Sequence, residues 1–264
     1  RIPMTPASAI NRAIASLKPG DTYTLPDGDI IGNIILPRGL SGSKGKFITI
    51  SGGKNTRIIA TDKSKAAIGV GGIKWLRFVG FTMVGGLNGA QASQNGNEYH
   101  PAKMIEQIYF VRLTAIDPVD DGIKANGGTE VHVHSCTVVG GKDHGIDFLG
   151  IDGGSIRLCD ISGNPIAITT KGGCRRIAIL RNTIRGCKDG LHIGERTSPQ
   201  WQAPWTSYSA ENVDVRGNDI SVTGNPVVAS QALGINALAV AGANRLTTTK
   251  RARGQMAPVV EVNG

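Results

Sequence analysis

Acidic, basic and imidazole side chains recur at similar places between residues 114 and 194. The carboxylates are Asp120, Asp121, Asp143 and Asp147, and the basic groups near them are Lys124, His144, Lys171, His192 and Arg196. Carboxylates gathered on one surface either bind a hard cation through oxygen or act as an acid and a base. Clustered like charges cost stability, so a purely structural ion-pair network, with Lys124, Lys142 and Lys188 as neutralising partners, is the alternative.

The sequence around these residues is repetitive. Thr114, Thr137, Asp160 and Thr183 hold one place in successive copies, each 23 residues after the last. A constant period in this range is typical of a solenoid. The 37 glycines, with scarce aromatic residues, favour short strands and tight turns. We therefore predict an all-β fold, a right-handed parallel β-helix (solenoid) with a short N-terminal capping α-helix.

The capping helix is predicted from the first residues. Thr5 suits an N-cap, Pro6 suits the first helical position, and Ile10, Ile14 and Leu17 have helical spacing. A solenoid needs a cap over its first open coil. We predict one β-helix domain over residues 1–264, described by its parts: a cap at 1–20, coils over 21–229 with inserts at 87–104 and 195–212, and a last coil or C-terminal cap at 230–264.

Strand alternation separates core side chains from surface side chains. The residues predicted to point inward are Ile123, Ile146, Ile166 and Leu191, and those that follow them and point outward are Lys124, Asp147, Ala167 and His192. Neighbouring strands lie about 4.8 Å apart, so Lys124 and Asp147 should touch. His192 should lie two coils beyond Asp147.

The stretch AIASLKPGDTYTLPDGDIIGNIILPRGLSGSKGKFITISGGKNTRIIA, residues 13–60, resembles the opening of β-helix polysaccharide lyases of the chondroitinase B and alginate lyase group. This resemblance implies the fold and says little about chemistry. A second stretch, IAITTKGGCRRIAILRNTIRGC, is similar to that group's catalytic region and would make Lys171 the base. Asn164 and Ile166 stand where that group has calcium-binding glutamates, and its Arg-His-Gly motif is absent.

Two shorter runs, DHGID at 143–147 and DGLHIG at 189–194, resemble the calcium-dependent pectate lyases of the family-nine type. The resemblance implies Ca²⁺ held by Asp143 and Asp147, with Asp120 or Asp121 as the ligand one coil earlier. His192 falls where that family has its lysine base, and an imidazole can do the same work. His144 stands where the family has another aspartate.

These residues lead to the prediction of a polysaccharide lyase that cleaves a uronate-containing polymer by β-elimination. His192 is the favoured base or acid, Lys171 is second, Lys124 is a charge partner of Asp147, and Arg196 is a base or clamp. Two other classes stay open. One is a β-helix glycoside hydrolase or epimerase, with Asp120, Asp121 and Asp143 as acid and base. The other is a non-catalytic carbohydrate-binding tail or adhesin module.

Aromatic residues mark the two inserts as a possible sugar-binding surface. Tyr99 lies in the first insert, and Trp201, Trp205 and Tyr208 lie in the second. Together with His144 they are predicted to contact substrate, because exposed aromatic rings make flat stacking platforms. The alternative is that these rings pack down and pin the loops to the coils.

The formal net charge of +9 favours an anionic partner, and an acidic polysaccharide is predicted. Only the charge favours a nucleic acid, since no nucleic-acid-binding signature is present. No apolar run is long enough for a membrane span, and no signal peptide is visible, so a secreted, periplasmic or virion-associated location is expected from the function. The spacing of Cys136 and Cys159 predicts stacked interior thiols or a disulfide. The oligomeric state stays open.

Overall fold

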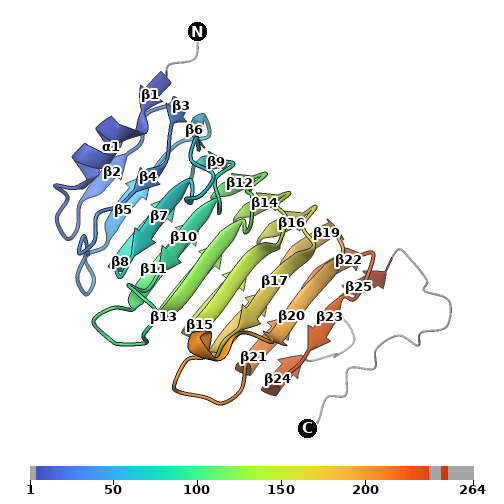
Figure 1. Cartoon of the computed structure of the whole chain (residues 1–264). Coiled ribbons are helices and arrows are strands. Elements are labelled where there is room, and N and C mark those ends of the chain that lie inside the picture. The colour runs from blue at the N-terminus through green and yellow to red at the C-terminus, as the bar shows by residue number, and fades with distance from the viewer. Residues whose placement is uncertain (1–3, 238–244, 249–264) are drawn as a thin grey trace.

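The chain forms a parallel β-helix, in which each coil adds a strand to stacks that run the length of the molecule (Figure 1). The computed structural model describes residues 4–237 and 245–248. All pairings between the named strands of this part are parallel. Parallel coils bury both the strand interiors and most backbone polar groups, which is why this Gly-rich and Ile-rich sequence needs no layer of helices.

The strands fall into three stacks. The first stack is a ten-stranded sheet: β1 (Met4–Pro6), β3 (Gly28–Ile31), β6 (Thr56–Ile59), β9 (Thr82–Val84), β12 (Thr114–Ile116), β14 (Thr137–Val139), β16 (Asp160–Ser162), β19 (Thr183–Cys187), β22 (Asp219–Val222) and β25 (Arg245–Thr248). The second stack contains β4 (Ile34–Ile35), β7 (Ile68–Gly71), β10 (Ala90–Ser93), the first halves of β13 (Ile123–His134) and β15 (His144–Arg157), then β17 (Ile166–Lys171), β20 (Asp189–Glu195) and β23 (Val227–Ala229). The third stack contains β2 (Thr22–Thr24), β5 (Ile48–Ser51), β8 (Lys74–Val79), β11 (Ile105–Val111), the second halves of β13 and β15, then β18 (Cys174–Leu180), β21 (Ala210–Arg216) and β24 (Ala232–Ala237).

The register confirms the predicted period. Thr114 pairs with Thr137, Thr137 with Asp160, and Asp160 with Thr183. Thr183 then pairs with Asp219, across the coil lengthened by the second insert. Equivalent side chains of successive copies therefore stand directly above one another.

The core runs along the axis as columns of buried side chains. Ile123 pairs with Ile146, Ile146 with Ile168, and Ile168 with Leu191, and all four are fully buried. The predicted inward position of Ile166 was wrong by two residues. In this coil the strand pairs with its neighbour in a register that counting residues along the repeat does not predict. Thr169, not Ala167, therefore pairs with Asp147 and faces outward.

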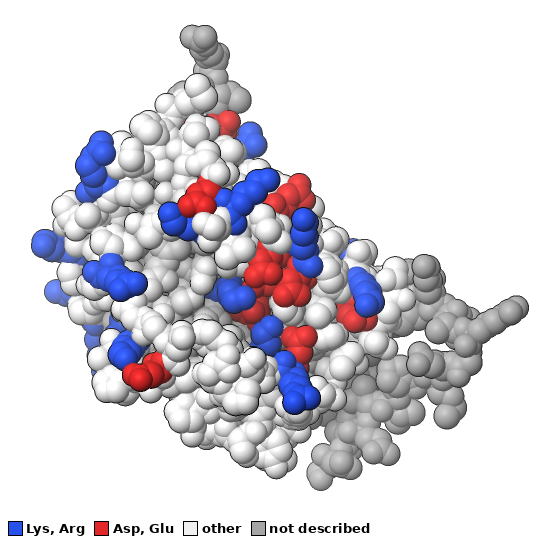
Figure 2. Space-filling model, in the orientation of Figure 1, with Lys and Arg blue, Asp and Glu red and all other residues white. Residues whose placement is uncertain are grey.

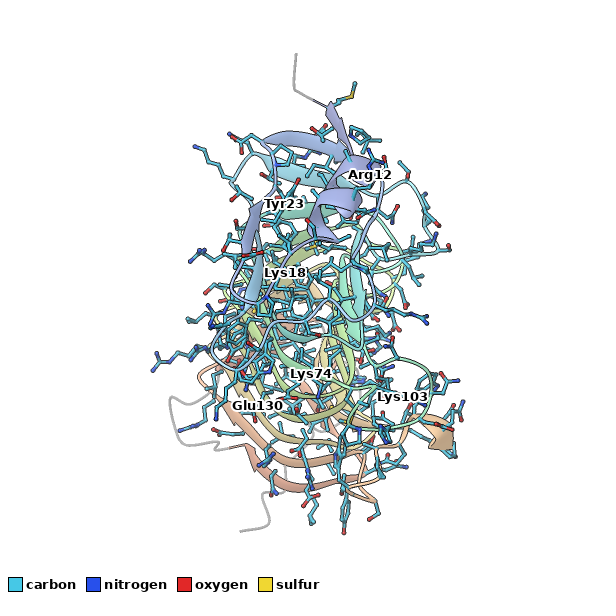
Figure 3. All side chains as sticks on the ribbon, turned by 90° about the vertical axis from the view of Figure 1, so that its left-hand side faces the viewer. Arg12, Lys18, Tyr23, Lys74, Lys103 and Glu130 are labelled. Carbon is cyan, nitrogen blue, oxygen red and sulfur yellow. The ribbon has the colours of Figure 1, made fainter. Side chains whose placement is uncertain are left out.

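The N-terminal helix is confirmed as α1 (Ala7–Ile14), which buries Ala7, Ile10 and Ile14. In Figure 3 it lies across the end of the coils that faces the viewer, and the labelled Arg12 belongs to it. Thr5 is not its N-cap: it lies in β1, and Pro6 takes the N-cap position without a side-chain hydrogen bond. The helix thus depends on the burial of its apolar face against the first coil.

Both inserts are shorter than predicted. Residues 90–93 of the first insert form β10, which pairs with β7 and β13. Ala90 and Ala92 point inward there while Gln91 and Ser93 point outward, so the strand has the correct alternation, but its core side chains are small. The second insert begins after β20, includes a short 3₁₀ turn, η1 (Pro199–Trp201), and ends at β21.

Other predictions concern single features. Cys136, Cys159, Cys174 and Cys187 are free buried thiols, which agrees with stacked interior thiols rather than a disulfide. No helix in residues 4–237 and 245–248 is long and apolar enough to cross a membrane. The run KRAR at residues 250–253, whose charges predict a solvated basic turn or an anion-binding cluster, lies outside the described residues.

A buried asparagine pair continues the column of Cys136 and Cys159 where the chain turns from the third stack to the first. The side-chain amide of Asn182 donates to Ile156 O and to Asn218 Oδ1, and its carbonyl oxygen accepts from the Cys159 amide. We predict that Asn182→Ala lowers the free energy of unfolding by about 3 kcal/mol, because three buried polar groups lose a partner. Urea unfolding measures this, with the exposed Asn55→Ala as control; equal stability of the two variants would contradict it.

Candidate functional site

Charged side chains gather on the outer face of the second stack, and Figure 2 shows acidic side chains clustered near the middle of the molecule with basic side chains around them. Strand register places them in three rows that run along the axis. The rows are Asp121, His144, Ile166, Asp189; Lys124, Asp147, Thr169, His192; and Asn126, Leu149, Lys171, Glu195. Lys124 and Asp147 are direct neighbours and His192 lies two coils beyond Asp147, as the sequence predicted.

Six of these side chains form a closed ring of alternating charge, which we call the charge ring: Asp121, His144, Glu195, Lys171, Asp147 and Lys124. From Asp121 to His144 the distance is 2.9 Å, and from His144 to Glu195 it is 3.3 Å. Lys171 Nζ lies 3.4 Å from both Glu195 and Asp147. Lys124 Nζ closes the ring at 3.1 Å from Asp147 and 2.5 Å from Asp121.

His144 is the imidazole of the charge ring. Its side chain is only 3% exposed. Burial by itself disfavours the imidazolium, but hydrogen bonds to Asp121 and Glu195 outweigh burial and raise the pKa of His144 to about 9. At neutral pH the ring therefore contains three cations and three carboxylates.

The two lysines of the charge ring are held as cations. Burial opposes the charge of Lys171, but Asp147 and Glu195 outweigh it and raise its pKa. The same balance, with Asp147 and Asp121 as partners, raises the pKa of Lys124. A hydrogen bond from His144, together with the nearby imidazole of His192, lowers the pKa of Glu195. A lysine with a raised pKa is a weak base at neutral pH, so Lys171 is better suited to bind a negative charge than to take a proton.

Asp120 and Asp143 stand at the solvent edge of the ring, with side chains 38% and 48% exposed. Partial burial raises the pKa of both carboxyl groups, and the negative charge of Asp121 raises each further. Asp143 Oδ2 lies 3.1 Å from His144 Nδ1. Carboxyl groups with raised pKa are suited to hold a proton for transfer.

His192 lies beside the ring on β20. Its Nε2 is 3.3 Å from Asp189 Oδ2, and its Nδ1 is 3.9 Å from Glu195 Oε1. Asp189 and Glu195 flank the imidazole at ion-pair distance, and 16% of its side chain is exposed. Neither contact is a hydrogen bond, and Nε2 has no hydrogen-bond partner among the described residues. A partly exposed imidazole beside two carboxylates can act in proton transfer.

Glu195 joins His144, Lys171 and His192, yet the sequence analysis missed it. The register between β17 and β20 shifts after Thr170, so that Ile193 pairs with Thr170 and Glu195 pairs with Lys171. Gly194 is the extra residue of this bulge, with φ +80°, and a Cβ there would lie 1.9 Å from Ser230 O. Bulges re-aim side chains, and simple alternation along the strand would have turned Glu195 away from this row. In the sequence, Gly194 was the one residue that could have indicated this bulge.

The charge ring does not fit the calcium site that the resemblance implies. Asp121 uses both oxygens, one on His144 and one on Lys124, and Asp147 is contacted by two ammonium groups. Asp121, Asp143 and His144 have possible ligand atoms within 4.8 Å of one another. His144 is nevertheless an imidazolium at neutral pH, which cannot bind a metal through the protonated nitrogens. An oxygen-only shell would require Lys124 to move away.

Aromatic residues of the first insert contact residues of the second insert, over the second and third stacks. The Tyr99 hydroxyl donates to Trp201 O at 2.9 Å, and the Tyr99 ring meets the Trp205 ring at 5.5 Å in an edge-on arrangement. Trp205 Nε1 donates to Gly173 O at 2.7 Å. Tyr208, in contrast, is 39% exposed, and Arg196 is exposed. Two of the four predicted aromatic side chains, Tyr99 and Trp205, therefore hold the loops in place, with the backbone of Trp201 as a partner. The predicted role of all four in substrate binding stays a prediction.

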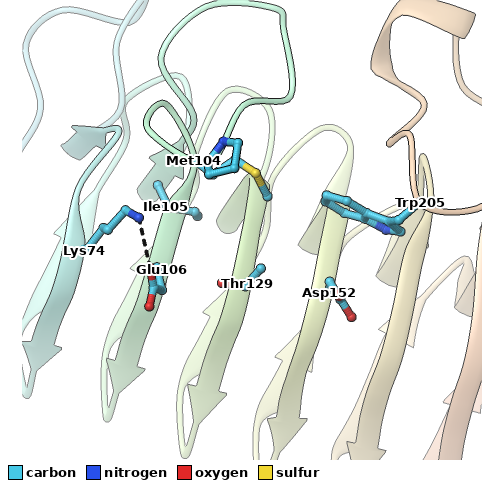
Figure 4. Close-up of a pocket in the computed structure, with 8 residues that line it drawn as sticks. Lys74, Met104, Ile105, Glu106, Thr129, Asp152 and Trp205 are labelled. Atoms are coloured by element: carbon cyan, nitrogen blue, oxygen red, sulfur yellow. Dashed lines mark hydrogen bonds and ion pairs between the residues drawn. The ribbon is translucent and has the colours of Figure 1, made fainter. Parts of the chain in front are cut away.

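A pocket of about 260 Å³ opens beneath these loops. Its lining is formed by Lys74, Pro101, Met104, Ile105, Glu106, Thr129, Asp152 and Trp205. Figure 4 shows Met104 and Trp205 reaching over the strands from the two sides, with the Lys74–Glu106 ion pair at one end and Asp152 at the other. A ring-shaped polar ligand would meet an apolar wall and charged ends there.

Comparison with known proteins gives structural likeness only. No family model and no curated protein matches the chain. A proposed glycosyl hydrolase from Parabacteroides merdae is 13% identical, with 69% of this chain and 96% of that chain covered and a TM-score of 0.49. An alginate lyase from Paenibacillus sp. FPU-7 is 15% identical, with 88% and 98% covered and a TM-score of 0.46. A tailspike protein of Escherichia coli bacteriophage HK620 is 11% identical, with 81% and 46% covered and a TM-score of 0.43.

The titration of His144 leads to a prediction about stability. Its pKa of about 9 in the folded chain exceeds the value near 6.5 of an unfolded chain, so its contribution is complete below about pH 6.5 and is lost as pH rises to 9. We expect the free energy of unfolding to fall by on the order of 3 kcal/mol over this window. Urea unfolding at pH 6 to 10 measures it. His144→Gln should flatten this part of the profile, and the exposed-loop variant His100→Gln should not; a flat wild-type profile would refute the prediction.

Proposed function

We propose that this chain is an enzyme that cleaves a uronate-containing polysaccharide by β-elimination at the outer face of the second stack. The observation that carries the proposal is the convergence of His144, Lys171 and His192 on the single carboxylate of Glu195. His192 is the imidazole that can act as the base, and His144 and Lys171 are the two cations. An elimination beside a carboxylate needs both a base and positive charge.

The reaction removes a weakly acidic proton next to the substrate carboxylate and expels the 4-linked sugar. His192 takes the proton, because its imidazole is partly exposed and has Asp189 and Glu195 within ion-pair distance to stabilise the imidazolium that forms. Lys171 is the cation that stabilises the charge developing on the substrate carboxylate. Asp143, whose pKa is raised, returns a proton to the departing sugar oxygen.

The surroundings of the ring support a polymeric acidic substrate. The sequence has a net charge of +9, which attracts polyanions over the whole surface. The charge ring itself is neutral at neutral pH, so it does not repel an acidic sugar as an unpaired carboxylate cluster would. Proteins with a similar chain path include an alginate lyase and a mannuronate-specific polysaccharide lyase. A polymer of this kind is met outside the cytoplasm or at a virion surface, which is the location we propose.

A second candidate function is hydrolysis of the glycosidic bond. Asp120 and Asp143 lie on neighbouring coils, both are part-exposed, and both have raised pKa values. Such a pair can act as acid and base around a water molecule without metal. This alternative uses the same surface and differs only in whether the proton is taken from the substrate or from water.

The two reactions leave different products, so one assay separates them. The purified chain is incubated with polymers rich in mannuronate, guluronate or galacturonate, and ultraviolet absorbance and reducing ends are followed together. Elimination gives an unsaturated, ultraviolet-absorbing end with each new reducing end. Reducing ends that appear without ultraviolet absorbance would contradict elimination and support hydrolysis. Polymers that are bound but left intact would overturn both in favour of a binding module.

Single substitutions test the residue roles. His192→Ala should lower kcat by about 10²-fold to 10⁴-fold, the usual effect of losing a general base. Lys171→Ala should lower kcat/KM by about 10²-fold through loss of charge stabilisation. Lys142→Ala, an exposed neighbour outside the ring, is the matched control. Full turnover in both His192→Ala and Lys171→Ala, with unchanged melting temperatures, would contradict the roles of His192 as base and Lys171 as stabilising cation.

The calcium prediction needs a separate measurement. Because Lys124 and Lys171 already neutralise Asp121 and Asp147, we expect excess chelator to leave both turnover and the melting temperature unchanged. Wild type is assayed after dialysis against chelator and again after addition of Ca²⁺. Lost activity that Ca²⁺ restores would mean that a metal displaces Lys124, as the pectate lyase resemblance implies.

A further inference from the structure

Ser155 lies on a different surface, the outer face of the third stack, between two histidines. Its Oγ is 2.9 Å from His132 Nδ1 and 2.7 Å from His134 Nε2. His132 and Ser155 are direct partners in the register of β13 and β15. The serine is half-buried, as are both histidines.

The hydrogen bonds of this cluster allow a relay of donors towards His132. Arg157, which can only donate, lies with its NH2 3.2 Å from His134 Nδ1, so that nitrogen is the acceptor. A neutral His134 then carries its proton on Nε2 and donates it to Ser155 Oγ. The Ser155 hydroxyl can in turn donate to His132 Nδ1 in the tautomer that leaves this nitrogen unprotonated.

A carboxylate lies near the end of this relay. With Nδ1 as acceptor, a neutral His132 carries its proton on Nε2, and this nitrogen lies 3.6 Å from Glu130 Oε2, which is within ion-pair distance but longer than a hydrogen bond. Gly153 leaves the room that this carboxylate needs, since a Cβ there would lie 2.2 Å from Glu130 Oε1. The Tyr109 ring stacks on His132 at 4.6 Å and 25° and fixes its plane. Serine, imidazole and carboxylate are thus ordered as in a catalytic triad.

The electrostatics keep the histidines in the required state. Burial, and after it the charge of Arg157, lowers the pKa of His132 to about 4. The pKa of His134 is lowered to about 4 for the same reasons. Both imidazoles are therefore neutral at pH 7, so His132 is free to accept a proton.

We propose that Ser155 is a nucleophile that cleaves small acyl esters, with His132 as its general base and Glu130 as the positioning carboxylate. The Oγ–acyl carbon bond forms as the hydroxyl proton passes to His132 Nδ1. The ester C–O bond then breaks, and the same proton passes to the departing alcohol. Water hydrolyses the acyl-serine by the reverse use of His132, which restores the hydroxyl and releases a carboxylic acid. The exposed guanidinium of Arg157 supplies donors for the developing oxyanion, while His134 keeps its hydrogen bond to Ser155 Oγ.

The surface around Ser155 points to an ester carried by a sugar. The Phe47 ring lies between those of Trp75 and Tyr109, with its centroid 5.3 Å from the first and 5.4 Å from the second. Arg77 lies 3.8 Å from the centre of the Phe47 ring and is exposed. Aromatic and cationic groups of this kind suit an acylated acidic sugar. The sugar part of the inference rests on the proposed function, but the serine chemistry does not.

The test uses the full chain and no polysaccharide. A fluorophosphonate probe should label wild type at Ser155, located by peptide mapping, and 4-nitrophenyl acetate should be hydrolysed. Ser155→Ala should abolish labelling and turnover, whereas Ser162→Ala, a half-buried serine of the first stack, should leave both unchanged. Absence of labelling at Ser155 in the folded wild-type chain would overturn the proposal.

Two histidine variants distinguish catalysis from a structural role. In His132→Asn the side-chain oxygen still accepts the hydrogen bond of Ser155 but cannot take the proton, so turnover should fall by about 10²-fold or more at unchanged melting temperature. His134→Gln keeps an N–H donor and should stay within about tenfold of wild type. Unchanged turnover in His132→Asn would refute the role of His132 as base. Because these assays contain no polymer, their outcome is independent of whether the charge ring cleaves polyuronates.

Discussion

The stacking of parallel coils at about 4.8 Å is the constraint on which the rest of the molecule depends. It brings each side chain onto its equivalent one coil away, as in the pairs of Thr114 with Thr137 and Ile123 with Ile146. Apolar residues become columns of the core under this constraint. Charged residues must alternate in sign or gain partners from neighbouring rows, because like charges at this distance repel.

In the second stack, the charge ring meets this requirement by alternating cations and carboxylates. Asp147 and Asp121 are fully buried carboxylates, which are stable only with cations in contact. Breaking such a set by removing one member is costly, whereas replacing the whole set by apolar residues is often neutral or stabilising. The core columns of the described coils are mostly apolar, with exceptions such as the buried Asn182 and Asn218, so the core itself does not depend on the six charged side chains.

Much of this organisation follows from the sequence, because period and alternation are local. The 23-residue spacing was sufficient to place Lys124 on Asp147 and His192 two coils beyond it. It failed where a coil departs from the common length: Ile168, not Ile166, is in the core. It failed again at Glu195, because the Gly194 bulge changes which way the strand faces. Register shifts arise from contacts between coils, which no single copy of the repeat contains.

A single long strand explains why two separate polar clusters can be built from the same coils. β15 carries Asp147 in the second stack and Ser155 in the third, with Gly150 at the bend between the two halves. Gly150 has φ +60°, and a side chain there would collide with the Tyr99 hydroxyl at 2.2 Å. The bend therefore does two things at once: it turns the strand to a new face and makes room for the loop that crosses it. The two coils that contain β13 and β15 each present one set of residues to the charge ring and another to the serine cluster, so two polar clusters form on different faces above the same core.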